Sequence, residues 1–122
     1  MTIQELYELI GGNYAAAQQI MRMDKLIDKY IRKLSASKVN EALMAAGAAM
    51  DPNGIFESAH AMKGVCANLG LESLFAAASE LSEEFRPGTP RHMSDEEVQE
   101  KLRLIDGMYQ RTAAGIDQYI KG

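Results

Sequence analysis

Apolar residues recur every three to four positions along nearly the whole chain, and this spacing is what most constrains the fold. Strand-like alternation is missing, and no internal repeat or low-complexity tract occurs. A period near 3.6 residues places apolar side chains on one face of an α-helix. The abundant residues, Ala, Leu, Met, Ile, Glu and Lys, are those that lose least on entering a helix. We therefore expect an all-α protein.

Capping and turn residues divide this pattern into six expected helices. Thr2 and Glu5 form a capping box for a short first helix, which Gly11 and Gly12 end. The later helices are expected at about 13–34, 38–50, 52–69, 71–85 and 94–120. The Pro-rich segment 86–90 is the clearest loop.

Each expected helix has an apolar stripe that predicts its buried face. The stripe of 13–34 is Ala16, Ile20, Met23, Ile27, Tyr30/Ile31 and Leu34, and that of 38–50 is Val39, Ala42, Leu43 and Ala46. The stripe of 52–69 is Ile55, Ala59, Met62, Val65/Cys66 and Leu69, and that of 71–85 is Leu71, Leu74, Ala78, Leu81 and Phe85. The stripe of 94–120 is Val98, Leu102, Ile105, Tyr109, Thr112, Ile116 and Tyr119/Ile120.

Stripes spaced close to 3.5 residues and joined by short loops indicate an antiparallel four-helix bundle with one or two short accessory helices. The 122 residues are enough for one core and too few for two. We expect a single helical domain over 1–122.

Composition and charge exclude several classes of function. The chain carries 13 basic and 17 acidic residues, and this net charge of −4 without a long basic run does not favour nucleic-acid binding. The single Cys66 excludes an internal disulfide and a cysteine-rich zinc site. No apolar run is long enough to span a membrane, and the N-terminus lacks the pattern of a signal peptide. We expect a cytoplasmic protein with no membrane contact.

His60 is the residue that does not fit the core pattern. At about 100° per residue, it lies roughly 160° around the helix from Met62, on the side away from the apolar stripe. Lys63 and Gly64 follow three and four residues later and therefore share its outer face. A neutral imidazole is a nucleophile near pH 7. A neighbouring ammonium can offset the charge of a phosphoryl group.

A glycine inside a helix costs about 1 kcal/mol relative to alanine, and clearance for a bulky partner would explain Gly64. Two ordinary explanations compete with this one. An exposed histidine beside a lysine is often only a solvated helix face, and a mid-helix glycine often lets another helix pack closely. The residues taken alone do not decide between these alternatives.

The segment around His60 resembles the signature of histidine-containing phosphotransfer (HPt) domains. In that signature, a histidine is followed by an apolar residue two positions on, then Lys-Gly, a run of small residues and Leu-Gly. Here it reads HAMKGVCANLG, from His60 to Gly70. The order of the expected helices also fits the family along essentially the whole chain.

The resemblance implies a phosphorelay carrier that is not itself an enzyme and needs no cofactor or metal of its own. His60 would be the phosphoacceptor, usually at Nε2. Response-regulator receiver domains would be its partners, each supplying an aspartate and bound Mg²⁺, with a hybrid histidine kinase as a further partner. The resemblance also implies a monomer whose helices 13–34, 52–69, 71–85 and 94–120 form the bundle, with the other two as accessory elements.

The same resemblance suggests roles for residues outside the signature. Lys63 and Arg86 would lie near the phosphate, and Gly64 would give clearance. Phe56, with Phe75, would provide exposed apolar contacts for the partner. Many members have small polar residues after Lys-Gly, where this chain has the apolar Val65 and Cys66. Ser82 falls where some members carry a glutamine that orients the imidazole, and its side chain is shorter.

Other readings remain open. His92 lies in the Pro-rich loop and is expected to be a solvated loop residue rather than a second acceptor or a metal ligand. Cys66 is expected to be a small buried hydrophobe. The main alternative function is an adaptor that binds signalling proteins without being phosphorylated. A further alternative is a histidine-bearing piece of a chemotaxis-type kinase, although no ATP-binding segment is present to phosphorylate it.

Overall fold

The chain folds into seven α-helices and no β-strand. The structure is a computed structural model that describes residues 1–122. The helices are α1 (Ile3–Ile10), α2 (Tyr14–Met21), α3 (Asp24–Ala36), α4 (Val39–Ala48), α5 (Pro52–Leu69), α6 (Glu72–Glu84) and α7 (Asp95–Lys121). The all-α prediction is confirmed. None of these helices combines the length with the unbroken apolar character that crossing a membrane requires.

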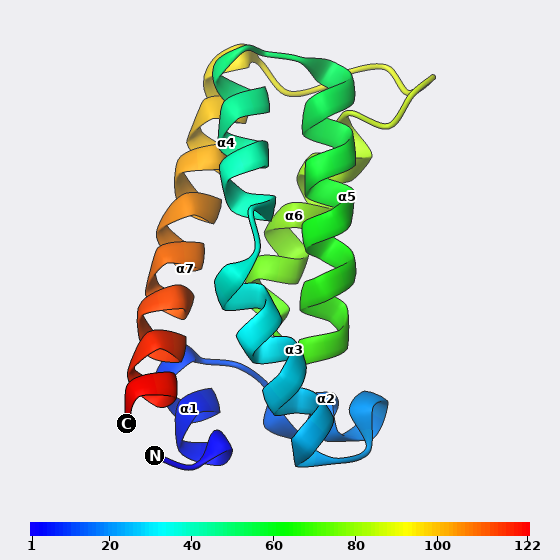
Figure 1. Ribbon diagram of the computed structural model, residues 1–122. Helices are drawn as coiled ribbons and strands as arrows, with labels where there is room; N and C mark the ends of the chain where they lie inside the picture. Colours follow the sequence, from blue (N-terminus) through cyan, green and yellow to red (C-terminus); the bar gives the residue numbers. More distant parts are fainter.

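Helices α3 to α7 stand side by side as a bundle, and α1 and α2 lie at one end of it (Figure 1). Helices α3 and α4 follow one another along the same side. From α4 onwards the chain reverses direction at each connection, as expected where short loops join neighbouring helices. The segment 38–50 was expected to be an accessory element. This expectation is wrong, because α4 packs against both α5 and α7.

A continuous cluster of buried apolar side chains fills the space between the helices. The predicted stripe of α6 is buried throughout, at Leu71, Leu74, Ala78, Leu81 and Phe85. The stripe of α5 is buried at Ile55, Ala59, Met62, Cys66 and Leu69. The stripe of α7 is buried at Val98, Leu102, Ile105, Tyr109, Thr112 and Ile116. Periodicity therefore predicted the core faces of these three helices.

The prediction of one helix over 13–34 is wrong, because the helix is interrupted by a turn between α2 and α3. Arg22 ends α2 in the left-handed conformation with a φ of 76°, and Met23 is extended with a φ of −147°. The carboxylate of Asp24 then accepts hydrogen bonds from the Tyr14 hydroxyl and the Gln18 amide. These contacts join the start of α3 to α2 and fix the turn.

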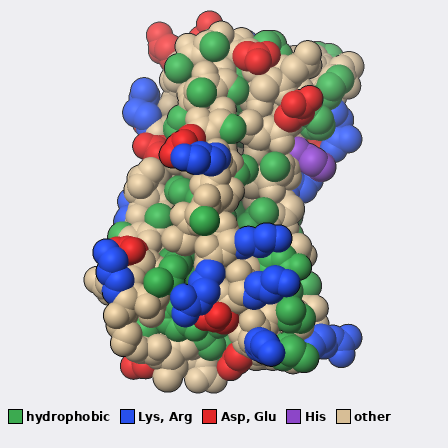
Figure 2. All heavy atoms as spheres, viewed as in Figure 1, with side chains coloured by type: hydrophobic (Ala, Val, Ile, Leu, Met, Phe, Trp, Pro, Cys, Tyr) green, Lys and Arg blue, Asp and Glu red, His purple; other side chains and the backbone are tan.

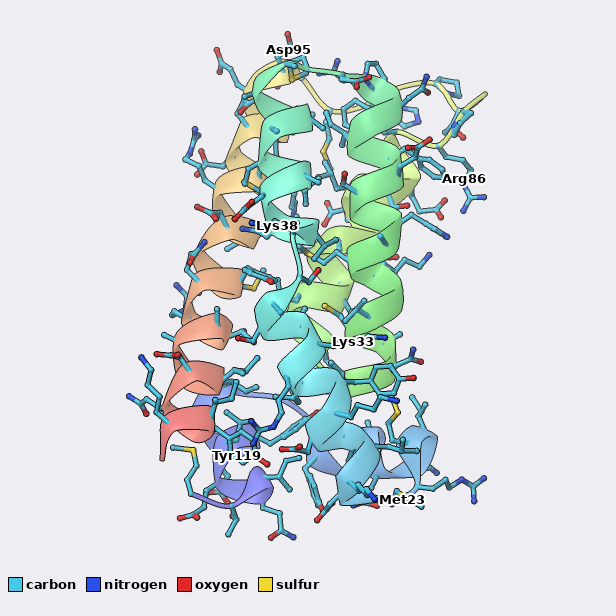
Figure 3. All side chains as sticks on the ribbon, viewed as in Figure 1. Met23, Lys33, Lys38, Arg86, Asp95 and Tyr119 are labelled. Carbon is cyan, nitrogen blue, oxygen red and sulfur yellow. The ribbon has the colours of Figure 1, made fainter.

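The break changes which side chains are buried. Met21 is buried, whereas Ile20 and Met23 are 52% and 51% exposed, although the predicted stripe placed both in the core. Figure 3 shows Met23 at the turn beneath α3. The part of the stripe that lies in α3 is buried as predicted, at Ile27, Ile31 and Leu34.

Helix α4 is rotated by about one residue from its predicted orientation. Leu43 is buried as predicted, but the other buried positions are Asn40 and Gly47. The remaining members of the predicted stripe are exposed or half-buried, at Val39, Ala42 and Ala46. Asn40 donates from Nδ2 to Oδ1 of Asp106 at 2.9 Å, and a Cβ on Gly47 would lie 2.4 Å from Leu102 Cδ1. Contacts with α7 therefore set the rotation of α4.

Tyrosine hydroxyls join segments that are far apart in the sequence. The buried Tyr7 hydroxyl donates to the carbonyl of Leu69 at 2.7 Å, which ties α1 to the last residue of α5. The Tyr119 hydroxyl of α7 donates to Asp28 of α3 at 2.6 Å (Tyr119 is labelled in Figure 3). The first bond helps to hold α5, which carries His60, against α1, and the second holds α7 against α3.

Candidate functional site

His60 lies in the interior of α5 on its outward face. Pro52 occupies the first turn of this helix, and Gly70 ends it in the left-handed conformation with a φ of 67°. Ala59 and Met62 are fully buried on either side of His60 in the sequence, whereas His60 is exposed. The core stripe of α5 thus directs the imidazole toward solvent, in the direction that the spacing predicts.

Phe56 stacks against the His60 ring. The ring centroids are 5.6 Å apart and the planes are inclined by 22°. Phe56 is half-buried and also packs against the core, so it is less available to a partner than the sequence predicts. Ser82 does not hold the imidazole, because this buried residue has no hydrogen-bond partner for its Oγ. Stacking on Phe56 is therefore the contact that restrains the ring.

Lys63 and Gly64 lie one turn further along α5, next to His60. Lys63 is half-buried and Gly64 is exposed. A Cβ built on Gly64 would meet no atom within 4 Å. Close packing of another helix of this chain therefore does not explain this glycine. Its effect is to leave open surface beside the imidazole.

Arg86, just beyond the end of α6, forms an ion pair with Glu83. Its Nε donates to Oε2 of Glu83 at 3.2 Å, and a terminal nitrogen donates to Oε1. Both side chains are about half exposed, and Figure 3 shows Arg86 beside the half of α5 that follows Pro52. Arg86 is therefore already engaged with a carboxylate in the unmodified protein.

Charged groups on α5 also affect the pKa of the Glu83 carboxylate. Hydrogen bonding to Arg86 is the main reason that the pKa of Glu83 lies below its ordinary value, and the charge of Arg86 adds to this. The positive charges of Lys63 and His60 lower the same pKa further. Glu83 therefore lies within Coulombic reach of the outer face of α5.

A comparison with protein-family models found one family that describes most of this chain. The model for the Hpt domain matches residues 14–115. The chain belongs to the Hpt domain family. This Hpt domain match runs from the first residue of α2 well into α7, so α1 lies outside it. Neither the curated proteins nor the solved structures gave a match.

Family membership confirms the predicted family and the expectation of a helical bundle. Hpt domains are histidine phosphocarriers of phosphorelays rather than catalysts, and they interact with receiver domains of response regulators. The His60 geometry fits that role, because a carrier must expose one imidazole to a docked partner.

The positive charge near His60 in this Hpt domain is local. A separate group of basic side chains lies over α2 and α3 in the view of Figure 2. The exposed members of that group are Arg22, Lys25, Lys29, Arg32 and Lys33. Near His60 the positive groups are Lys63 and Arg86, of which Arg86 is bound to Glu83. The apolar spacing from which the site was predicted gave no sign of this pairing between Glu83 and Arg86.

The other residues considered from the sequence lie elsewhere in the Hpt domain. His92 is an exposed residue of the loop between α6 and α7, and its backbone N–H donates to the Glu84 carboxylate. Cys66 is 1% exposed, and burial raises the pKa of its thiol to about 12. Cys66 is therefore a packed thiol that stays protonated at neutral pH, as expected of a core residue. Phe75 is half-buried on α6 and packs against the core.

Proposed function

We propose that this Hpt domain carries a phosphoryl group on His60, exchanging it with the aspartate of a response-regulator receiver domain. The observation that carries the proposal is an exposed imidazole inside a bundle helix, stacked on Phe56 and bordered by open surface at Gly64. A docked receiver can reach such a ring without any rearrangement of the core.

The transfer step needs no reactant beyond the two proteins and the receiver's Mg²⁺. The lone pair of Nε2 forms a bond to phosphorus while the phosphorus–oxygen bond of the receiver's aspartyl phosphate breaks. The electron pair of that bond stays on the aspartate, which leaves as a carboxylate. Phosphoryl transfer of this kind depends mainly on positioning and charge neutralisation. The reverse step returns the group to a receiver.

The neighbouring side chains support this step in different ways. Stacking on Phe56 orients the imidazole, so the ring samples fewer orientations and loses less conformational entropy before attack. The Lys63 ammonium offsets negative charge on the transferred group. Gly64 leaves room for the receiver surface. Arg86 is a further partner for the phosphoryl oxygens, once it is free of Glu83.

The oligomeric state, the location and the upstream kinase form part of the same proposal. Residues 1–122 fold as one unit and act as a monomer in the cytoplasm. A hybrid histidine kinase supplies the phosphoryl group through its own receiver domain.

Transfer of a label tests the proposal. The protein is incubated with a receiver domain that carries a radiolabelled aspartyl phosphate. We expect an acid-labile, base-stable label on the protein, absent from His60→Gln and present on the matched control His92→Gln. Label that survives on His60→Gln would show that the acceptor is a different residue.

A further inference from the structure

The side chains of Glu83 and Arg86 lie beside the outer face of α5 because α5 and α6 form an antiparallel hairpin. Only Gly70 and Leu71 separate the two helices, and the helices pack along their length. Residues equally distant from this turn lie at the same level, which places His60 level with Leu81. Glu83 follows within one turn of helix, and Arg86 within two.

Charge on this face is balanced before any phosphoryl group arrives. On α5 the groups near the imidazole are Lys63 and, one turn earlier, the exposed Glu57. The other two are Glu83 of α6 and Arg86 just beyond the end of that helix, which form the ion pair. Because both partners of that pair are about half exposed, water screens their attraction and the pair can open readily.

We propose that Glu83 limits how long His60 keeps a phosphoryl group, by holding Arg86 in the unmodified protein and by opposing the charge of the phosphoryl group once it is present. This inference rests on the proposed function of His60. It assigns to Glu83 a positioning role that acts through Arg86, together with a direct electrostatic effect on the modified ring.

The direction of the exchange follows from charge. A phosphoryl group carries roughly −1.5 to −2 charges and three acceptor oxygens, against one charge on the carboxylate. Arg86 therefore moves toward phosphohistidine when it forms, because the guanidinium finds more charge and more acceptors there. Glu83 then loses its partner and repels the phosphoryl group. Both effects raise the free energy of the phosphorylated state and favour passing the group on to a receiver.

Replacing Glu83 by glutamine should lower the free energy of the phosphorylated state. Glu83→Gln leaves Arg86 available and removes the repelling charge, so we expect phosphohistidine to persist about 1.4 to 5 times longer, the range for one exposed charge pair. Glu80→Gln is the matched control, because Glu80 is an exposed glutamate of the same helix that pairs with Lys101 instead. Glu57→Gln removes a carboxylate near His60 without freeing Arg86, and should have the smaller effect.

The experiment uses phosphoramidate as the donor, so that it does not depend on docking by any receiver. Lifetimes of phosphohistidine are measured for the wild type, Glu83→Gln, Glu57→Gln, Glu80→Gln and the double variant Glu83→Gln/Arg86→Ala. NMR of the Arg86 Nε–Hε group is recorded before and after phosphorylation. We expect this signal to move in Glu83→Gln without phosphate, and to move in the wild type on phosphorylation. We also expect the double variant to lose part of the added lifetime.

Equal lifetimes in the wild type and Glu83→Gln, or an Arg86 signal that phosphorylation leaves unchanged, would overturn the inference about Glu83. The proposed function would stand in either case, because His60 would still accept the group. Complete failure of phosphoramidate and of a phosphorylated receiver to label His60 would instead overturn both.

Discussion

Replacing Gly64 by glutamine should stabilise the fold and at the same time slow phosphoryl transfer from a receiver domain. Gly64 is exposed within α5, and a Cβ there would meet no atom within 4 Å, so a side chain can be added without strain. Glycine is the poorer helix former, and its replacement should raise the free energy of unfolding by about 0.5–1 kcal/mol. For a chain of this size, that corresponds to a rise in Tm of about 2–6 °C.

The added side chain would occupy the open surface beside His60. A receiver that must approach within bonding distance of the imidazole would meet it, and small displacements of reacting atoms reduce rates steeply. We expect transfer from a phosphorylated receiver to slow by about tenfold or more. Phosphorylation by phosphoramidate should change little, because that donor is small.

Rapid-quench transfer assays and thermal unfolding measure the two effects separately. Gly64→Ala is the matched control, because it gives a similar gain in stability while adding only a methyl group. Gly70→Ala should have the opposite sign, because Gly70 has a φ of 67° and its Cβ would lie 2.3 Å from the carbonyl oxygen of Asn13. A Gly64→Gln protein that receives phosphate at the wild-type rate would refute the clearance role.

Three further predictions concern the core and the charges around the site. Met62→Ala should lower the free energy of unfolding by about 2–5 kcal/mol in denaturant titrations because Met62 is fully buried, and the half-buried Phe56→Ala should cost less. Lys63→Ala should slow transfer in quench assays while changing stability by less than about 0.5 kcal/mol; an unchanged rate would contradict its role. Because burial raises the pKa of Cys66 to about 12, the folded thiol stays protonated where the unfolded thiol ionises. Its contribution to stability is therefore complete below the unfolded pKa, about 9, and is lost toward pH 12. Cys66→Ala should show a smaller fall in unfolding free energy over this alkaline range, and an equal fall would count against the buried thiol.

Periodicity predicted the helices whose buried face is determined by their own apolar residues. Helices α5, α6 and α7 are long and have complete stripes, so one face is strongly favoured for burial. Capping residues predicted the start of α7 in the same way, since Ser94 and Glu97 exchange both hydrogen bonds of a capping box.

Tertiary contacts decided the parts that the sequence pattern did not predict. The three-and-four spacing continues through Arg22, which is neither glycine nor proline, so nothing local marks the break between α2 and α3. Hydrogen bonds to Asp24 fix that turn. The rotation of α4 likewise depends on Asn40 and Gly47 meeting α7, which periodicity within one helix cannot show.

In the candidate site, too, some features follow from the sequence of one helix and others depend on tertiary contacts. The outward direction of His60 follows from the stripe of its own helix, and the sequence alone predicted it. The pairing of Glu83 with Arg86 joins residues three apart at the end of α6, and its relation to His60 depends on the register between two helices. An antiparallel α5–α6 hairpin with a two-residue turn was the available signal for that register. The stacking of Phe56 needed side-chain conformations as well as helix spacing.

The most direct test of the phosphocarrier account compares receiver binding with signalling output for His60→Ala. A carrier with this substitution should still bind its receiver, because Phe56, Gly64 and the bundle surface remain, but should lose all output of the pathway. Phe56→Ala should weaken both binding and output. Receiver affinity and pathway output are measured for both variants in the same cells and with the same receiver. Full output from His60→Ala would contradict the account and indicate an adaptor that acts by binding alone.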